Sequence, residues 1–281
     1  MANEPVVLVE NFYSVIQFPG HTPSADEEAL GFEAWHVADG RRSLSDYWTS
    51  TTTNHQRSLK VTCDRVRAAN TLALDRGHNL AGVALSVIGS NDNFTTYRAV
   101  WQGTVPTAIT SPGDLDNTNG VVTEEGAFLV RFPTDAYTYW SLEIPALGAG
   151  ILPQVVGAWL GLAWQPDFLG NDWGEDQCEL VCQEQSSDLG WVGRTYPQPR
   201  RNGSLVFQLT DYWSYELARY HVQGHFLARG RPMWIVMDRS QAERAVLAEF
   251  MPGTNGLRYR RGWGFRSGDI GWREHEPRRP V

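Results

Sequence analysis

The sequence predicts a mostly β protein, in which a β-sandwich of jelly-roll character precedes a smaller, β-rich α+β domain. Hydrophobic residues make up 42% of the 281 residues, which is enough for a substantial core. The 27 glycines and 15 prolines fit many turns and short strands better than helical bundles. In the segment 83–89, Val83, Leu85 and Val87 recur with the period of two that a half-buried strand shows.

Eight candidate strands occupy the first part of the chain, which we predict to be the sandwich over residues 1–165. They cover residues 6–9, 58–63, 70–74, 83–89, 97–102, 127–132, 139–144 and 155–164. Turn sequences separate several of them, at residues 90–92, 111–114, 119–120 and 132–135. Strand spacing of this sort is typical of a sandwich.

The rest of the chain is predicted to be an acidic connector over 166–190 and a second domain over 191–281. Acidic residues recur between residues 167 and 188 with no base among them, which is typical of a solvated connector. Candidate strands of the second domain cover residues 203–209, 233–237, 258–266 and 269–273. Thr210 and Ser240 are plausible N-caps, which predicts helices over 212–227 and 241–250.

A turn and a tryptophan near the start of the chain carry a family resemblance. Asp39-Gly40 is a tight-turn sequence, and Trp48-Thr49 follows it after a polar loop. A second block, residues 69–92, consists of a strand, a turn, an alternating strand and a polar tip. The two blocks resemble those of discoidin-type (coagulation factor 5/8 C-type) galactose-binding-like domains. This resemblance implies a discoidin-like sandwich.

A second resemblance concerns the role of the chain. The block 69–92 is similar to one that is frequent in structural components of tailed-phage particles. In the second domain, a strand and a helix are followed by an apolar strand that begins after Arg231-Pro232. This order resembles the ring-forming domain of siphophage distal-tail and tail-tip proteins. Together these imply a structural virion protein of a phage tail tip or baseplate, a distal-tail or minor tail protein. The resemblance also implies that the chain forms a ring in the virion tail and that this ring is assembled in the cytoplasm of the host bacterium. The implied partners are further copies, other tail proteins (tail tube, hub, tape-measure region) and a host-surface glycan.

Charge is unevenly distributed along the chain. Residues 190–281 contain 15 Arg and 8 acidic residues (+7), and the rest contains 9 basic and 24 acidic residues (−15). This is either an ordinary surface in a genome that favours Arg codons or an Arg-rich face that docks on acidic partners. The net charge of −8 argues against nucleic acid as the main partner. No apolar run approaches the length of a membrane span.

Homotypic contacts are predicted for the second domain, because Arg and Trp are enriched in interface cores. The candidate interface residues are Arg258, Arg260, Arg261, Trp263 and Trp272. An acidic patch at 172–179 on one copy is the expected mate of the face at 258–261 on the next. Trp234 is expected in the core of that domain, because Met233 and Ile235 flank it.

Aromatic residues predict a candidate ligand-binding surface on the sandwich. Aromatic faces stack on the C–H groups of sugars, and ligands of galactose-binding-like domains meet the loops at one end of the sandwich. The candidate residues are Trp48, Asn91, Asp92, Phe94 and Tyr97. Core packing is the alternative for Trp48 and Trp101. The competing function is therefore a carbohydrate-binding module of a cell-surface or cell-wall-associated protein. Such a module usually has a signal peptide and disulfides, whereas this sequence has no basic start and three cysteines, an odd number.

No residue pattern predicts catalysis, so the chain is expected not to be an enzyme, and no cofactor is expected. The sequence has neither a Gly-x-Ser-x-Gly elbow nor a phosphate-binding loop. His221 and His225 stand four apart, as do Cys178 and Cys182, but further zinc ligands are missing from the sequence nearby. The weak candidates for a calcium site are Asp39, Asp114 and Asp116; after Asp114 the glycine of a calcium loop comes one position late.

Overall fold

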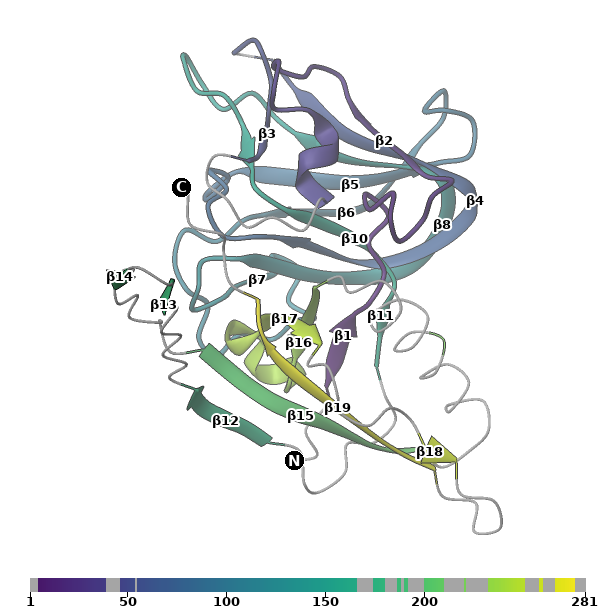
Figure 1. Ribbon diagram of the computed structural model, residues 1–281. Coiled ribbons are helices and arrows are strands. Elements are labelled where there is room, and N and C mark those ends of the chain that lie inside the picture. Colours follow the sequence, from purple (N-terminus) through teal and green to yellow (C-terminus); the bar gives the residue numbers. More distant parts are fainter. Residues whose placement is uncertain are drawn as a thin grey trace.

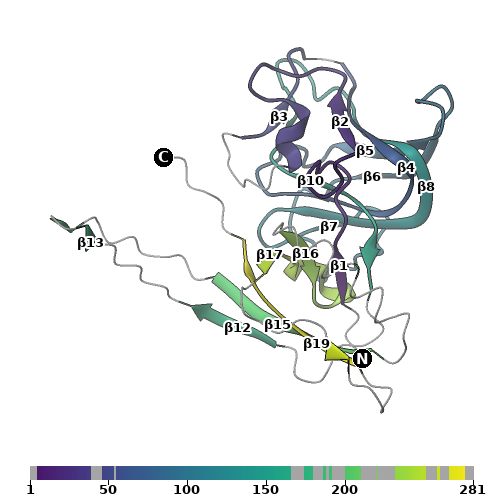
Figure 2. The ribbon, with the colours of Figure 1, turned by 45° about the vertical axis from the view of Figure 1, so that its right-hand side comes forward.

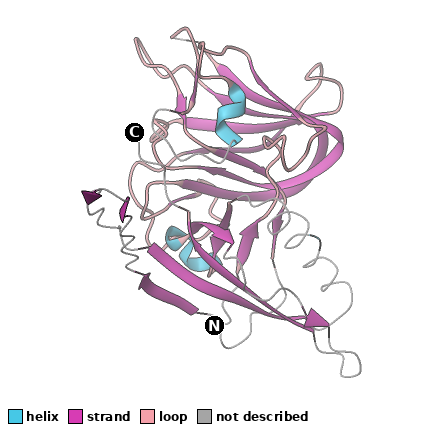
Figure 3. Cartoon of the chain, viewed as in Figure 1, coloured by secondary structure: helices cyan, strands magenta, loops and turns pink. Residues whose placement is uncertain are grey.

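The chain is mostly β, as predicted. The computed structural model describes residues 5–38, 46–53, 55–165, 174–179, 186–187, 190–191, 200–209, 220, 232–250, 258–259 and 266–275. Strands dominate this part of the chain, and the short 3₁₀ helices η1 (Ala34–Ala38) and η3 (Arg239–Arg244) accompany them (Figure 3).

Strands of the first part are β1 (Val6–Leu8), β2 (Thr22–Ala25), β3 (Trp48–Thr49), β4 (Arg57–Leu74), β5 (Ala84–Ser90), β6 (Arg98–Thr104), β7 (Val121–Val122), β8 (Phe128–Ile144), β9 (Gln154–Val155), β10 (Ala158–Gly161) and β11 (Ala163–Trp164). Strands of the second part are β12 (Gly174–Glu179), β13 (Ser186–Ser187), β14 (Gly190–Trp191), β15 (Arg200–Leu209), β16 (Met233–Val236), β17 (Val246–Phe250), β18 (Arg258–Tyr259) and β19 (Arg266–Glu274). Figure 1 shows where they lie.

Two long strands, β4 and β8, build the sandwich. They pair with each other along both of their lengths, and the pairing register shifts between Thr62 and Arg67 and again between Ala69 and Thr71. Both strands curve round one side of the sandwich, so each belongs to two layers (Figure 1). One layer contains β2, β5 and β6, and the other contains β10 and β7. The sequence predicted a turn at 132–135, whereas Pro133 lies inside β8 opposite a register shift, where the partner strand tolerates its missing N–H.

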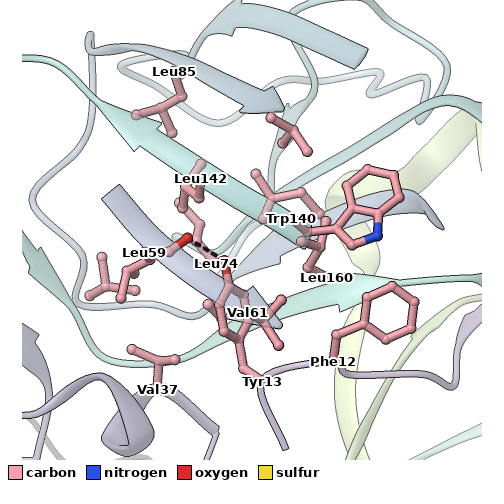
Figure 4. Close-up of a cluster of buried hydrophobic side chains, with 14 of the residues drawn as sticks. Phe12, Tyr13, Val37, Leu59, Val61, Leu74, Leu85, Trp140, Leu142 and Leu160 are labelled. Atoms are coloured by element: carbon pink, nitrogen blue, oxygen red, sulfur yellow. Dashed lines mark hydrogen bonds between the residues drawn. The ribbon is translucent and has the colours of Figure 1, made fainter. Parts of the chain in front are cut away.

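The space between these two layers holds the larger core, here called the sandwich core. Leu72 and Leu74 of β4 point into it, as do Leu59 and Val61 from the other half of the same strand. Figure 4 shows how Leu59, Val61 and Leu74 meet side chains of the other strands. The Tyr13 hydroxyl is buried there and donates to the Leu59 carbonyl at 3.1 Å. The core therefore satisfies this buried hydroxyl while it buries the apolar faces of both layers.

The opposite face of the second layer is buried too. Ala73, between Leu72 and Leu74 on β4, faces a second cluster that contains β1, β16 and β17 residues; we call it the joint core. Its members are Val6, Leu8, Ala73, Leu115, Val121, Ala127, Leu129, Trp159, Ala163, Trp234, Val236, Ala242, Ala245 and Leu247. Trp159 of β10 meets Trp234 of β16 edge to face, with ring centroids 5.9 Å apart. A layer with a core on each face explains the unbroken apolar stretch at the end of β4.

An eight-stranded sheet completes the fold in the order β11-β1-β16-β17-β19-β15-β12, with β18 beside β19. Figure 2 shows this sheet below the sandwich from a second angle. Two adjacent strands of this sheet, β1 and β11, come directly before and after the sandwich in the chain. They pair with each other, Val7 with Trp164 and Leu8 with Ala163. The sandwich is thus inserted between two strands of the other sheet. The boundaries predicted at residues 165 and 190 stay a prediction, but β12 lies within the range expected to be a connector.

The predicted helix over 241–250 is wrong. Residues Arg239–Arg244 form η3, and Asp238, not Ser240, is its N-cap; Asp238 Oδ1 accepts from the Ser240 N–H at 2.9 Å. The helix ends at Ala245, whose ψ of 145° is extended, and the chain continues as β17 beside β16. The three apolar residues after Ala245 gain more from the sheet and the joint core than from another helical turn. The predicted helix over 212–227 lies, but for one residue, outside the described part of the chain.

Candidate ligand-binding surface

Residues 91–97, which connect β5 to β6, form a tightly held loop that we call the tip loop. Ser90 Oγ accepts from the backbone N–H groups of Asp92 at 3.2 Å and Phe94 at 2.9 Å. It also donates to Asp92 Oδ1 at 2.8 Å. The Asp92 carboxylate accepts from the Thr96 backbone at 2.9 Å and from the Thr96 hydroxyl at 2.6 Å. These bonds hold the loop from both ends, as in other Asx turns.

The backbone of the tip loop adopts a conformation that needs such support. Asn93 and Phe94 have φ of 54° and 63°, in the left-handed region. Asn tolerates this region, whereas for an ordinary L-residue such as Phe it costs about 1–2 kcal/mol. The loop is also tied to the sheet, because Asn91 Oδ1 accepts from the Thr138 N–H of β8 at 3.0 Å. The hydrogen bonds thus fix a strained loop in one shape before any ligand arrives.

Asp92 is ionised at neutral pH and serves the loop itself. Hydrogen bonds from the Thr96 hydroxyl and backbone, and from Ser90, hold the pKa of the Asp92 carboxyl below its usual range. Its oxygens already accept the donors of the loop. The side-chain oxygen of Asn91 is also engaged, by the Thr138 N–H of β8. These two predicted candidates therefore position the loop, whereas the aromatic residues beside them are the groups free to face a ligand.

Phe94 and Tyr97 present aromatic surface at the tip loop. Tyr97 is 67% exposed, and Phe94 is half-buried. The Phe94 ring meets the edge of Tyr139 with centroids 6.0 Å apart and an interplanar angle of 61°. Lys60 Nζ lies 5.5 Å from the centroid of the Phe94 ring, at cation–π distance. The surface is thus a small aromatic group with a cation at its margin.

The sheet brings Lys60 and Tyr139 to the loop. Tyr139 of β8 lies opposite Ser90, the last residue of β5, and opposite Thr62 of β4. Lys60 comes two residues before Thr62, so its side chain is on the same face. Sequence reasoning missed both residues. Lys60 stands out in the sequence as the only lysine, but only the strand register shows that it lies near Phe94.

Paired charges surround this surface. Lys60 forms an ion pair with Asp26. Next to Tyr97, the exposed Arg98 guanidinium lies 3.1 Å from Asp135 Oδ2, which also accepts from the Tyr137 hydroxyl at 3.0 Å. Surface pairs of this kind contribute little to stability, about 0–1 kcal/mol. They leave several N–H donors of Arg98 directed to solvent, within reach of a polar ligand.

Trp48, the first of the predicted ligand residues, is not on this surface. It has no exposed area, and its indole N–H donates to the Glu27 carbonyl at 3.1 Å. Direct ligand contact by Trp48 is therefore wrong, and the alternative of core packing is confirmed. Trp101 is also core, 6% exposed, with its indole N–H on the Thr118 carbonyl at 2.7 Å. Both indoles are satisfied in the interior, as buried Trp side chains usually are.

The predicted interface residues divide in a similar way. Trp234 lies in a core, as expected, but this core is the joint core shared with the sandwich. Trp272 has no exposed area in this chain, so the prediction that it contacts a neighbouring subunit is wrong. Arg258 belongs to β18, and Arg260, Arg261 and Trp263 lie outside the described residues, as does part of the acidic patch. The predicted charge pairing stays a prediction.

The candidate metal residues that the structure describes, Asp114 and Asp116, are engaged with other groups of the protein. Among the residues that the structure describes, no three His, Cys, Asp or Glu side chains form a metal-binding group. Asp116 faces two arginines, with Arg239 Nη1 at 3.1 Å and Arg131 Nη1 at 3.8 Å. Asp114 Oδ1 accepts from the Asp116 N–H at 3.0 Å. Asp39, Cys182, His221 and His225 lie outside the described residues, and Cys178 is in β12.

Within the described ranges, no helix has the length and apolar character that crossing a membrane requires.

Comparisons with known proteins gave similarities of structure. No protein-family model matches the sequence, and no curated protein matches it. A chitosan-binding module of a chitosanase/glucanase from Paenibacillus sp. IK-5 is 18% identical with a TM-score of 0.39, over 54% of this chain and 97% of the module. The family 32 carbohydrate-binding module of Clostridium perfringens NanJ, in complex with galactose, is 14% identical with a TM-score of 0.39, over 57% of this chain and 99% of the module. A Ruminococcus gnavus GH29 fucosidase is 10% identical with a TM-score of 0.42, over 56% of this chain and 28% of its own. At these TM-scores the similarities carry no argument about ligands.

Proposed function

We propose that the sandwich is a carbohydrate-binding module and that sugar binds at Phe94 and Tyr97 of the tip loop. The observation that carries the proposal is the exposure of Tyr97 on a loop whose backbone is fixed by its own hydrogen bonds. A rigid aromatic side chain in a preset position loses little conformational entropy on binding. The polar groups beside it, Arg98 and the hydroxyls of the loop, offer donors to sugar hydroxyls. The role is one of binding, without a chemical step.

Substitutions of Tyr97 test this proposal. Tyr97→Ala removes the ring, and Tyr97→Phe keeps it, so the pair separates stacking from hydrogen bonding by the hydroxyl. We expect a glycan array to identify a ligand for the full chain, and titration calorimetry to show a Kd at least about tenfold weaker for Tyr97→Ala. Tyr97→Phe should stay within about threefold of the parent. Equal affinity of the parent and Tyr97→Ala for every glycan that binds contradicts the site.

A second proposal concerns where the module acts. We propose that the chain is a structural protein of a phage tail tip, in which the sandwich is displayed on an assembly body that contains the eight-stranded sheet. The observation in its favour is the insertion of the sandwich between β1 and β11, two neighbouring strands of that sheet. A module inserted in this way has two connections to its body, so the body carries it as one unit, as a receptor-contacting element needs.

Particle composition tests the second proposal. Mass spectrometry of purified phage particles should find this chain, and electron microscopy of the isolated protein should show rings of several copies. Absence of the chain from particles contradicts the tail assignment and leaves the sugar-binding proposal untouched, because binding is measured on the isolated protein.

A further inference from the structure

Two clusters of charged residues connect the sandwich to the eight-stranded sheet, outside the joint core. The first lies where the chain enters and leaves the sandwich, at residues 9–11 and 161–162, which we call the neck. The second connects the turn after β7 with β15 and β19, and we call it the latch. Both clusters contain a carboxyl group that is largely removed from water. Neither has a part in the tip loop.

Glu10 is the central residue of the neck. It is 8% exposed, and its carboxyl group accepts a hydrogen bond from the Leu162 backbone across the neck. The two segments of the neck are too close for any side chain at Gly161, because a Cβ there would lie 2.4 Å from the Glu10 carbonyl oxygen. Burial raises the pKa of Glu10 to about 7, against the opposing charges of Arg67 and Arg65.

The charges that face Glu10 come from one bend of β4. Arg67 is shared, since its guanidinium also binds Asp64 through Nε at 3.0 Å and Nη2 at 2.9 Å. The buried Cys63 thiol lies in the same cluster, and His21 Nε2 lies 3.1 Å from Asp64 Oδ1. Burial lowers the pKa of His21, so this ring stays neutral near pH 7. Arg67 is therefore engaged by the Asp64 carboxylate, which leaves Glu10 incompletely compensated when it ionises.

The latch contains a pair of carboxyl groups. Arg201 of β15 binds Glu125 in the turn after β7, and its backbone N–H donates to Glu274 Oε2 of β19 at 3.2 Å. Arg76 Nη1 lies 3.8 Å from Glu125 Oε2, and Arg201 Nε lies 3.7 Å from Glu274 Oε2. Burial, then the hydrogen bond and charge of Glu125, raise the pKa of Glu274. A proton held between the two carboxyl groups removes their repulsion.

The remaining charges near the latch are paired among themselves. On β19, Arg273 Nε lies 2.7 Å from Glu249 Oε1 of β17, and His275 Nδ1 lies 3.5 Å from Glu249 Oε2. Arg201 Nη1 also donates to the Arg244 carbonyl at the end of η3, at 3.2 Å. One guanidinium thus holds three elements together, and the two carboxyl groups that it serves lie close enough to each other to repel when both are charged.

We propose that the neck and the latch make the joint between sandwich and sheet responsive to pH: the joint is closed while Glu10 is protonated and the Glu125–Glu274 pair shares one proton, and it loosens when these protons are lost. Ionisation places a buried negative charge in the neck and restores repulsion in the latch. An opened joint returns these groups to water, which the ionised carboxylates prefer. The sandwich then changes its angle to the sheet without unfolding, because its own core does not involve these residues.

Hydrogen exchange measured by mass spectrometry on the full chain tests the proposal. The segments to follow are 161–164 and 271–275, at about pH 5.5 and about pH 8.5, after correction for the intrinsic pH dependence of exchange. We expect opening of these segments to increase at the higher pH. For Glu10 alone, the upper limit of the increase between these two pH values is about 30-fold. The rise of its pKa from 4.5 to about 7 acts over this range, but part of the effect is already present at about pH 5.5.

Two variants and a control complete the experiment. Glu10→Gln with Glu274→Gln mimics the protonated state and should keep the joint closed at both pH values. Glu124→Gln, an exposed neighbour of Glu125, should behave as the parent does. Equal opening of the parent at the two pH values overturns the proposal, and so does an unchanged pH response in the double variant. The parent measurement alone is decisive should the double variant not fold.

Discussion

The tip loop and the neck each depend on one acidic residue, and the two residues behave in opposite ways. Asp92 in the tip loop is exposed, and hydrogen bonds that favour its charged form lower its pKa. Glu10 in the neck is buried, and loss of hydration raises its pKa to about 7. Water and backbone donors make a carboxylate a scaffold in the first region, while burial makes it a proton-sensitive group in the second. The comparison teaches that the surface we propose for binding and the joint we propose to move use the same side-chain chemistry in different solvation.

The largest expected effect concerns the apolar packing of the joint. Trp234→Ala removes a fully buried ring that packs against Trp159, so we expect a loss of about 3–5 kcal/mol in the free energy of unfolding, measured by chemical denaturation. The control is Trp35→Ala, since Trp35 is 47% exposed and should cost about 1 kcal/mol or less. Similar losses for the two variants contradict the assignment of Trp234 to a shared core.

The next effect follows from the ionisation of Glu10. Its pKa in the folded chain is raised, so its contribution to stability is complete below the unfolded pKa of about 4.5 and is lost as the pH rises through about 7. Glu10→Gln should therefore match the parent near pH 4.5 and be more stable by about 3 kcal/mol near pH 8. Denaturation at both pH values checks this. Glu28→Gln, at an exposed position, should show no such gain, and a destabilised Glu10→Gln protein at high pH contradicts the account.

A smaller effect is expected at the tip loop. Ser90→Ala removes the acceptor of two backbone N–H groups, which should cost about 1 kcal/mol and expose the Phe94 amide to faster hydrogen exchange. The matched control is Ser86→Ala on the same face of β5. Unchanged protection of Phe94 in Ser90→Ala shows that the hydroxyl does not hold the loop.

The smallest effect on stability is expected where we propose the largest effect on binding. Tyr97 is exposed and makes no buried contact that the fold needs, so Tyr97→Ala should change the free energy of unfolding by no more than about 0.5 kcal/mol. A thermal or chemical denaturation curve that shifts much further means that Tyr97 is part of the packing, and its loss of binding then has another explanation.

Local patterns in the sequence predicted the parts of the fold that are set locally. The alternation at 83–89 corresponds to β5, and the polar residues 90–92 predicted the hairpin tip that became the tip loop. Met233 and Ile235 indicated the burial of Trp234. In each case, neighbours within a few residues determine the burial or the turn.

Features that depend on distant pairing were not predictable in the same way. The charge-rich segment 64–67 and Pro133 looked like ends of strands, but the paired bulges of β4 and β8 carry both strands through. The segment 241–250 had the length of a short helix, and only the presence of β16 makes its second half a strand. The burial and the raised pKa of Glu10 could not be predicted from its neighbours in sequence, because the groups that act on it, among them Leu162 and Arg67, are far away along the chain.

The reactivity of Lys60 offers the most direct test of where the chain binds sugar. Lys60 is the only lysine and lies 5.5 Å from the Phe94 ring, so an amine-acetylating reagent modifies this side chain and the N-terminal amine alone among primary amines. With a saturating glycan, we predict slower acetylation of Lys60 and an unchanged rate at the N-terminus, measured by mass spectrometry. An unchanged rate at Lys60 while the glycan is bound would contradict the account and place the sugar site elsewhere.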